Sequence, residues 1–208
     1  MERLAGEPGL PVRMTSNENP ETKNKESQSG VPGFKEWAIV CDSIARGETS
    51  LIFRKGGIAE GRDGFRFKYQ RFFLFPTHFH GQIERTRLSP DRDVRPQQNT
   101  ALISVFVEVE FTTLLQDLNL LRPLEPLHVM QASVLEERFH YDEPEGLYLA
   151  FVRAYRVLPR WILPLRPSYG GCRSWLTLPD APPELQTEAV LSDEEQDRRR
   201  LLVTETLA

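Results

Sequence analysis

The sequence predicts an α+β fold: an N-terminal helix followed by a curved, mostly antiparallel sheet or small barrel with short helices. Several segments between residues 50 and 178 are rich in β-branched and aromatic residues, and alternate or run apolar as strands do. The clearest helical repeat lies ahead of them, in residues 34–47. The 16 prolines interrupt much of the remaining chain, so long helices are few.

The first half of the chain shows one helix and three strands by its apolar pattern. In FKEWAIVCDSIARG, residues 34–47, apolar side chains recur every three and four residues along one helical face, which ends at Gly47. We expect strands at 50–54, 65–69 and 71–76. The second of these alternates apolar and cationic residues, and the third is more uniformly apolar and stops at a proline.

The second half begins with an irregular segment, because residues 84–99 are polar and punctuated by proline. Two strong strands follow, at 101–111 and 146–159. Between them an apolar helical repeat is cut by Pro123 and Pro126, which predicts one or two short helices. The sequences WILPL and RSWLTLP predict edge strands, where proline is tolerated.

The chain of 208 residues is long enough for one ordinary domain with tails. Residues 1–32 are rich in polar residues and proline and have no apolar period, so we expect a disordered tail. A single α+β domain then covers 33–179. A charged and partly helical tail covers 180–208, where Ser192 and Glu195 have the spacing of a capping box.

Composition limits the class of protein. A net charge of -4 argues against a chain that coats nucleic acid, but leaves a local basic patch open. The start of the chain lacks the apolar core of a secretion signal, and no apolar run approaches the ~20 residues that span a bilayer. We therefore expect a soluble, cytoplasmic protein with no membrane partner, in which Cys41 and Cys172 are free thiols.

Four phrases carry a resemblance to a known family: KEWAIVCDSIARGETSLIFRKGGI, FFLFPTHFH, LEPLHVM and YGGCRSW, in this order. They resemble the bacterial family known as domain of unknown function 1802. The resemblance covers most of residues 34–178. It implies no established activity and no catalytic residues.

A second resemblance concerns the fold. A helix, a glycine and a strand that ends in arginine are similar to the opening of the ASCH domain, a PUA-like barrel with the signature G-x-K-x-x-E-x-R. Gly47 and Arg54 match that spacing, whereas Thr49 and Ile52 replace its lysine and glutamate. The resemblance implies a PUA-like barrel and an association with RNA or modified nucleotides, and the missing glutamate weakens a hydrolase reading.

The stretch FRKGGIAEG sets Arg54 and Lys55 directly before Gly56 and Gly57. It is not a Walker phosphate loop, because the lysine precedes the glycines and no GK[ST] occurs. Two interpretations remain: a tight hairpin with solvated cations, or a turn whose backbone N–H groups and two cations contact an anionic ligand.

This turn opens the basic region of the chain. Residues 54–95 hold ten Lys and Arg residues against five Asp and Glu. Interleaved aromatic residues could stack on bases. We favour a core role for Phe65, Phe67 and Tyr69, because alternation sends them to one face of a strand.

The histidines His78 and His80 could share one strand face, a spacing that metal sites use. No nearby cluster of ligands accompanies them, so we expect no metal and no cofactor. We interpret His80 either as a hydrogen-bond donor to a ligand or as a structural histidine.

The loop PSYGGCRSW, residues 167–175, combines two glycines with Tyr169, Cys172, Arg173 and Trp175. A backbone of this kind can approach a ligand closely, and either aromatic ring could serve as a stacking platform. Cys172 would be nucleophilic only with a nearby base, and a turn that fixes the packing of the tryptophan is the simpler interpretation.

We therefore predict a binding module that contacts RNA, DNA or a nucleotide. The predicted contact residues are Arg54, Lys55, Gly56, Gly57, His80, Tyr169, Arg173 and Trp175. One alternative is a hydrolase of phosphate-bearing or nucleotide substrates, which requires His80, Glu36 or Asp42, and Cys172 to converge in one pocket. Another is an accessory protein that recruits a partner through its tails.

Overall fold

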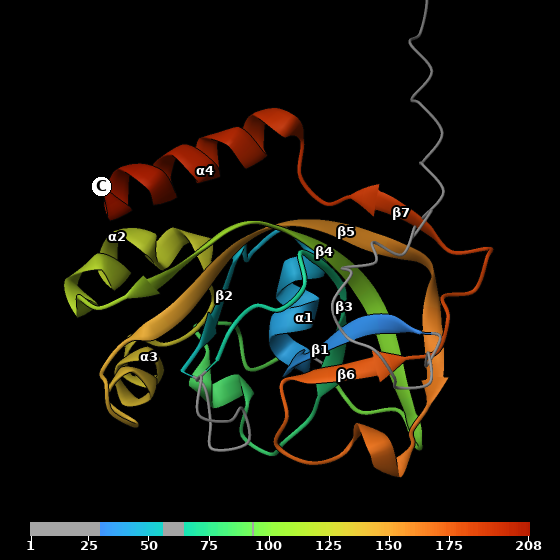
Figure 1. The fold of residues 1–208 in the computed structure, drawn as a ribbon. Coiled ribbons are helices and arrows are strands. Elements are labelled where there is room, and N and C mark those ends of the chain that lie inside the picture. The colour runs from blue at the N-terminus through green and yellow to red at the C-terminus, as the bar shows by residue number, and fades with distance from the viewer. Residues whose placement is uncertain (1–29, 56–64, 93) are drawn as a thin grey trace, which may run out of the picture.

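A computed structural model describes residues 30–55, 65–92 and 94–208 (Figure 1). Its strands are β1 (Val31–Trp37), β2 (Leu51–Arg54), β3 (Arg71–Thr77), β4 (Thr100–Leu115), β5 (Leu147–Pro164), β6 (Trp175–Leu178) and β7 (Gln186–Ala189). Its α-helices are α1 (Ala38–Ala45), α2 (Leu121–Leu124), α3 (Ala132–Phe139) and α4 (Asp193–Leu207). Short 3-10 turns lie at Ile83–Arg85, Leu118–Leu120, Glu125–Leu127 and Pro167–Tyr169. No helix in the described part of the chain is long and apolar enough to cross a membrane.

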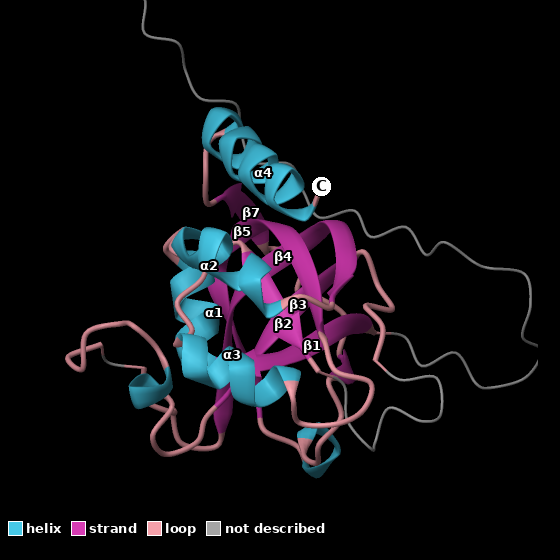
Figure 2. Cartoon of the chain, turned by 90° about the vertical axis from the view of Figure 1, so that its left-hand side faces the viewer, coloured by secondary structure: helices cyan, strands magenta, loops and turns pink. Residues whose placement is uncertain are grey.

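The strands form one seven-stranded sheet in the order β2-β5-β4-β3-β1-β6, with β7 added to β5. All pairings are antiparallel except that of β1 with β3. The sheet curves around α1, which contacts β1, β3, β4 and β5 (Figure 1). Seen from the side, α2 and α3 lie on one side of the strands and α4 lies across the top (Figure 2). The predicted α+β fold with a curved, mostly antiparallel sheet is confirmed.

The long strands β4 and β5 make the curve possible. Their register shifts between Ile103 and Val105 and again between Val109 and Phe111. Such irregularities bend a strand and increase its local twist. One part of the β4–β5 pair can therefore pack against α1, while the other part contributes to a second hydrophobic core.

Strand β3 is buried on both faces, which explains its uniformly apolar sequence. Phe72 and Leu74 join the core around α1. Phe73 and Phe75 point to the second core, where they meet residues of β4 and β5 such as Trp161. A strand between two apolar layers does not alternate.

The N-terminal helix begins later than the sequence predicts. Residues 34–37 belong to β1, which pairs in parallel with β3 and antiparallel with β6. The spacing of Phe34 and Trp37 fits a helix as well as a strand end, so periodicity cannot separate the two over four residues. The backbone hydrogen bonds to the two flanking strands, β3 and β6, stabilise the strand conformation of these residues.

One residue that the sequence analysis predicted, and one that it did not, satisfy backbone groups at the two ends of α1. Gly47 has a φ of 75° and its N–H donates to the Ile44 carbonyl at 3.0 Å, which confirms it as the helix stop. At the other end, Gln82 Oε1 accepts a hydrogen bond from Ile39 N at 3.1 Å. A side chain 43 residues away thus caps the helix.

The strand predicted at 65–69 is not formed. Phe65 is fully buried and packs edge-on against Phe67, whereas Tyr69 is 48% exposed. The core role is therefore right for Phe65 and wrong for Tyr69. Alternation specifies which side chains are buried, but it does not supply the neighbouring strand that a ladder needs.

The segment after residue 180 packs onto the domain. Strand β7 pairs with β5, and α4 buries Gln196 and Val203. Ser192 Oγ accepts a hydrogen bond from Glu195 N at 3.3 Å, so the predicted cap forms. The segment therefore contributes a strand and a buried helix face to the domain.

Replacing Val203 with alanine should lower the free energy of unfolding by about 1.5–2 kcal/mol, because two buried methyl groups lose their packing. Val203 lies in α4 and has no exposed surface. Urea unfolding followed by circular dichroism measures the effect. Replacing the exposed Leu201 of the same helix with alanine is the matched control. An equal loss in both variants would contradict the docking of α4.

Candidate anion-binding cleft

The predicted contact residues divide among several places. Tyr169, Arg173 and Trp175 line one cleft, whereas His80 lines a different hollow beside the turn at Ile83–Arg85. Gly56 and Gly57 lie outside the described residues.

The cleft beside β6, called the β6 cleft below, has a volume of about 640 Å³. Its wall is β6, its rim is the segment that follows β5, and Lys35 of β1 enters from the neighbouring strand. The lining residues are Lys35, Arg166, Ser168, Tyr169, Gly170, Arg173, Trp175, Leu176, Thr177, Leu178 and Pro179. The volume falls in the range of ordinary small-ligand sites.

Lys35 ties the rim of the cleft to the sheet. Its backbone N–H donates to Ser174 O at 2.8 Å, and its Nζ donates to the carbonyls of Gly170 and Gly171 at 2.8 and 2.9 Å. Gly171 has a φ of 76°, the left-handed region that favours glycine. The glycine pair thus lets two carbonyls turn toward one ammonium group.

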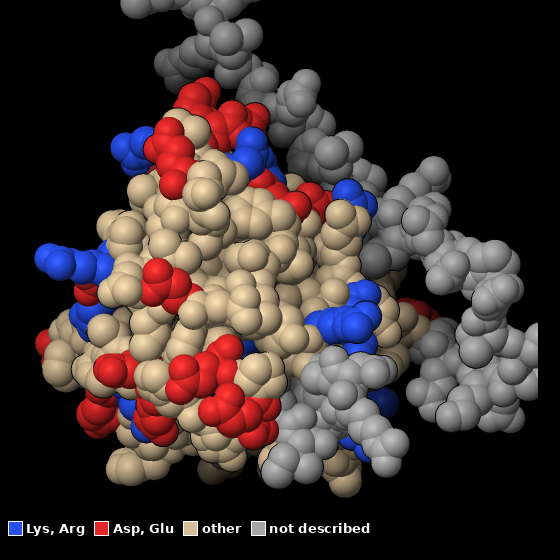
Figure 3. Space-filling model, turned by 60° about the vertical axis from the view of Figure 1, so that its left-hand side comes forward, with Lys and Arg blue, Asp and Glu red and all other residues tan. Residues whose placement is uncertain are grey.

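The electrostatics of the β6 cleft are one-sided. Lys35, Arg166 and Arg173 line it, and none of the described lining residues is acidic. Burial lowers the pKa of Lys35, and the charge of Arg173 lowers it further, against an opposing effect of Cys172. By contrast, acidic side chains gather at two places on the face drawn in Figure 3. The cleft is therefore a local cationic site on a chain of net charge -4.

Of the two rings expected as platforms, only Trp175 is partly exposed. It packs edge-on against Phe34 and Phe72 at centroid distances of 4.7 and 4.9 Å, and its Nε1 donates to Arg66 O at 3.2 Å. Tyr69 lies 5.1 Å from it. Tyr169 is buried in the second core, so its ring serves packing.

Arg54 is held by the protein itself. Its Nη1 lies 2.8 Å from Glu36 Oε2, its Nη2 donates to the carbonyl of Lys35, and its guanidinium lies 4.6 Å from the centroid of the Phe34 ring. The arginine therefore fixes the backbone of β1 at the point from which Lys35 enters the β6 cleft.

Lys55 is likewise engaged internally. Its Nζ donates to the carbonyls of Phe139 and Pro144 at 3.0 and 2.7 Å. The carbonyl of Phe139 belongs to the last turn of α3, where a cation is favourable. The two cations that precede the glycine turn thus have structural contacts.

A buried polar cluster lies beneath this region, and sequence reasoning missed it. Glu36, Thr49, His128 and Arg138 line a cavity of about 10 Å³. Burial lowers the pKa of Arg138 to about 10, and burial and the charge of Arg87 lower the pKa of His128 to about 4. These residues come from distant segments, so no local motif signals them.

The groups that a hydrolase would need lie in different places. Glu36 lines the buried cavity, Asp42 lines a pocket on the flank of α1, and His80 lines the separate hollow. Cys172 is exposed. Among the described cavities, none collects the set that the hydrolase alternative requires. His78 and His80 also line different hollows.

Comparison with known proteins gives a family and a set of similar structures. A family model described as "Domain of unknown function (DUF1802)" matches residues 33–200. None of the curated proteins matches the chain.

The similar solved structures include an ASCH protein from Zymomonas mobilis, with 12% identity, a TM-score of 0.44, and coverage of 82% of this chain and 92% of that one. A serine-to-alanine mutant of the same protein aligns with 13% identity, a TM-score of 0.43 and coverage of 82% and 94%. A tyrosine-to-phenylalanine mutant aligns with 14% identity, a TM-score of 0.40 and coverage of 72% and 90%.

Proposed function

Because the chain belongs to the family described as "Domain of unknown function (DUF1802)", a description that names no activity, we propose a function from the β6 cleft. The protein is a binding module for single-stranded nucleic acid or a nucleotide. One observation carries the proposal: three cations and a partly exposed tryptophan line the cleft, with no carboxylate among its described lining residues.

Each group suits a different part of such a ligand. Arg166 and Arg173 can donate two parallel hydrogen bonds to a phosphate, whereas Lys35 supplies a point charge. The ring of Trp175 offers a surface on which a base can stack. Because every base has such a face, we expect little sequence preference.

Arg54 takes a positioning role in this proposal, since it holds the carbonyl of Lys35 and the carboxylate of Glu36. The contacts expected for Gly56, Gly57 and His80 stay predictions. Lys55 is proposed to support the segment before the glycine pair through its two carbonyl contacts.

Replacing Arg173 with alanine should weaken binding of single strands to a similar degree for all sequences. One lost phosphate contact should also reduce the slope of log K against log salt by about 1. The measurement is fluorescence anisotropy with labelled RNA and DNA oligonucleotides of about 12 nucleotides, between about 50 and 200 mM salt.

The control for this variant is Arg122→Ala, which removes an exposed arginine of α2 that does not line the β6 cleft. It should leave both affinity and slope unchanged. The proposal fails if the unmodified protein binds neither oligonucleotide at the lowest salt, or if Arg173→Ala and Arg122→Ala behave alike.

A further inference from the structure

A second pocket lies on the flank of α1 and takes no part in the proposed function. It is called the arginine pocket below, and its volume is about 670 Å³. It is lined by α1, the end of β3, the start of β4, the middle of β5 and the loop at 94–97. It shares no lining residue with the β6 cleft.

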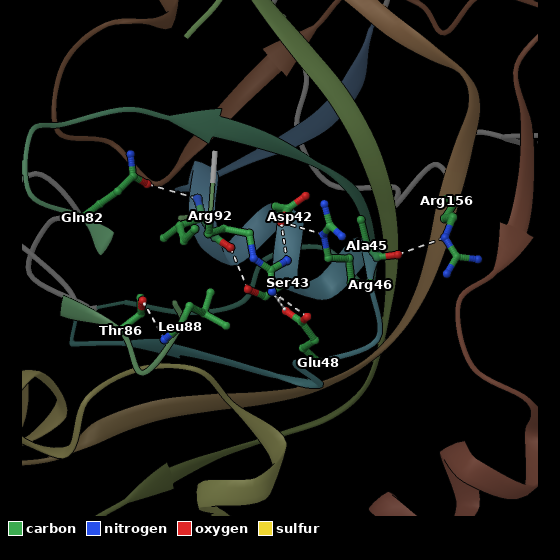
Figure 4. Close-up of polar contacts among 11 residues, drawn as sticks. Asp42, Ser43, Ala45, Arg46, Glu48, Gln82, Thr86, Leu88, Arg92 and Arg156 are labelled. Atoms are coloured by element: carbon green, nitrogen blue, oxygen red, sulfur yellow. Dashed lines mark hydrogen bonds and ion pairs between the residues drawn. The ribbon is translucent and has the colours of Figure 1, made fainter. Parts of the chain in front are cut away.

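Four arginines line this pocket, one directly after α1, one in the loop at 94–97 and two on β5: Arg46, Arg95, Arg156 and Arg160. The single carboxylate among its described lining residues is Asp42. Asp42 Oδ2 lies 2.9 Å from Arg46 Nε and 2.9 Å from Arg92 Nη1, so two guanidinium groups already neutralise it (Figure 4). Among the described residues that line the pocket, positive side chains therefore outnumber negative ones.

The helix end that faces the pocket would by itself repel an anion, because the carbonyls at a helix C-terminus carry partial negative charge. Arg156 offsets this effect: its Nε donates to the carbonyl of Ala45 at 3.0 Å (Figure 4). The bond also fixes the guanidinium against α1. Its two terminal nitrogens have no protein partner in the described part of the chain.

The remaining walls suit a compact ligand. Thr100 and Ser104 of β4 line the pocket with hydroxyl side chains, and Ala38, Leu102 and Val157 supply apolar surface. The volume matches that of pockets for small ligands. Guanidinium groups match the geometry of phosphate oxygens, and each can donate a pair of hydrogen bonds.

We propose that the arginine pocket binds a small molecule that carries two or more linked phosphate groups. The four arginines line a volume of about 670 Å³, which is far larger than a single phosphate fills. A ligand with linked phosphates places several anionic oxygens within reach of different guanidinium groups at once.

The test uses the full chain and inorganic pyrophosphate as the probe, without divalent ions, in isothermal titration calorimetry. Inorganic phosphate at the same ionic strength controls for general anion effects. Arg160 is exposed on β5, so Arg160→Ala should fold normally. We expect it to weaken pyrophosphate binding about tenfold, as the loss of a charge-assisted hydrogen bond implies. Arg160→Lys should recover part of the affinity, because lysine keeps the positive charge but cannot donate the paired hydrogen bonds of a guanidinium group.

The proposals for the arginine pocket and the β6 cleft can be refuted independently of each other. Arg160→Ala should leave single-strand binding unchanged, and Arg173→Ala should leave pyrophosphate binding unchanged. The inference is overturned if pyrophosphate binds no better than phosphate, or if Arg160→Ala has no more effect than the control Arg122→Ala. Melting curves of all variants verify that each one is folded.

Discussion

Replacing Glu36 with alanine is expected to lower the free energy of unfolding by about 3–5 kcal/mol. The carboxylate is 3% exposed and pairs with Arg54, which is 16% exposed. It also accepts a hydrogen bond from Trp37 N at 2.7 Å. Removing it leaves the guanidinium beneath β1 without its counter-charge, and a buried charge without a partner is far costlier than a lost surface pair.

A double-mutant cycle distinguishes the energy of the ion pair between Glu36 and Arg54 from the cost of the cavity that alanine leaves. Urea unfolding of Glu36→Ala, Arg54→Met and the double variant forms a double-mutant cycle. If the pair is coupled as its geometry indicates, the double variant should lose less stability than the sum of the two single variants. A strictly additive result would contradict the stabilising role assigned to the pair.

Lowering the pH from 7 to 4 is expected to reduce the free energy of unfolding by about 3 kcal/mol through His128 alone. This side chain is 5% exposed, and burial is the main cause that lowers its pKa from 6.5 to about 4. The unfolded chain takes up a proton near pH 6.5, whereas the folded chain does so only near pH 4. The unfolded state therefore binds more protons across this window, and stability falls as the pH falls.

The comparison that isolates His128 is the variant His128→Gln. Carboxylates whose pKa is lowered in the fold, such as Glu195 beside Arg199, also lose their contribution in acid, and they do so in both proteins. Unfolding free energies measured at several pH values should show a smaller loss in the variant by about 3 kcal/mol. Parallel curves for the two proteins would rule out a buried neutral histidine.

The candidate site was partly predictable because part of it is local in sequence. Tyr169, Arg173 and Trp175 fall within seven residues of one another, so a single loop brings them to the β6 cleft. Lys35 lies 135 residues from the carbonyl of Gly170 that it contacts. No pattern along the chain connects the two, because the connection is made by the pairing of β1 with β6.

The arginine pocket was even less predictable from the sequence than the β6 cleft. Its arginines are scattered over the chain, and only the curvature of β4 and β5 around α1 brings them together. A count of charges locates a basic region at 54–95, yet three of the four arginines lie outside that range. Charge in the sequence is therefore a poor guide to charge in a pocket.

The sequence by itself determined the features that depend on short-range chemistry. The alternation of β4, the apolar run of β3 and the stop of α1 at Gly47 follow from side-chain period and backbone freedom within a few residues. Only the tertiary structure decided where Phe34 and Trp37 belong, and that Arg54 of FRKGGIAEG faces Glu36. Both outcomes depend on partners that are distant in sequence, and the energy of burying a charge or completing a ladder is set by those partners.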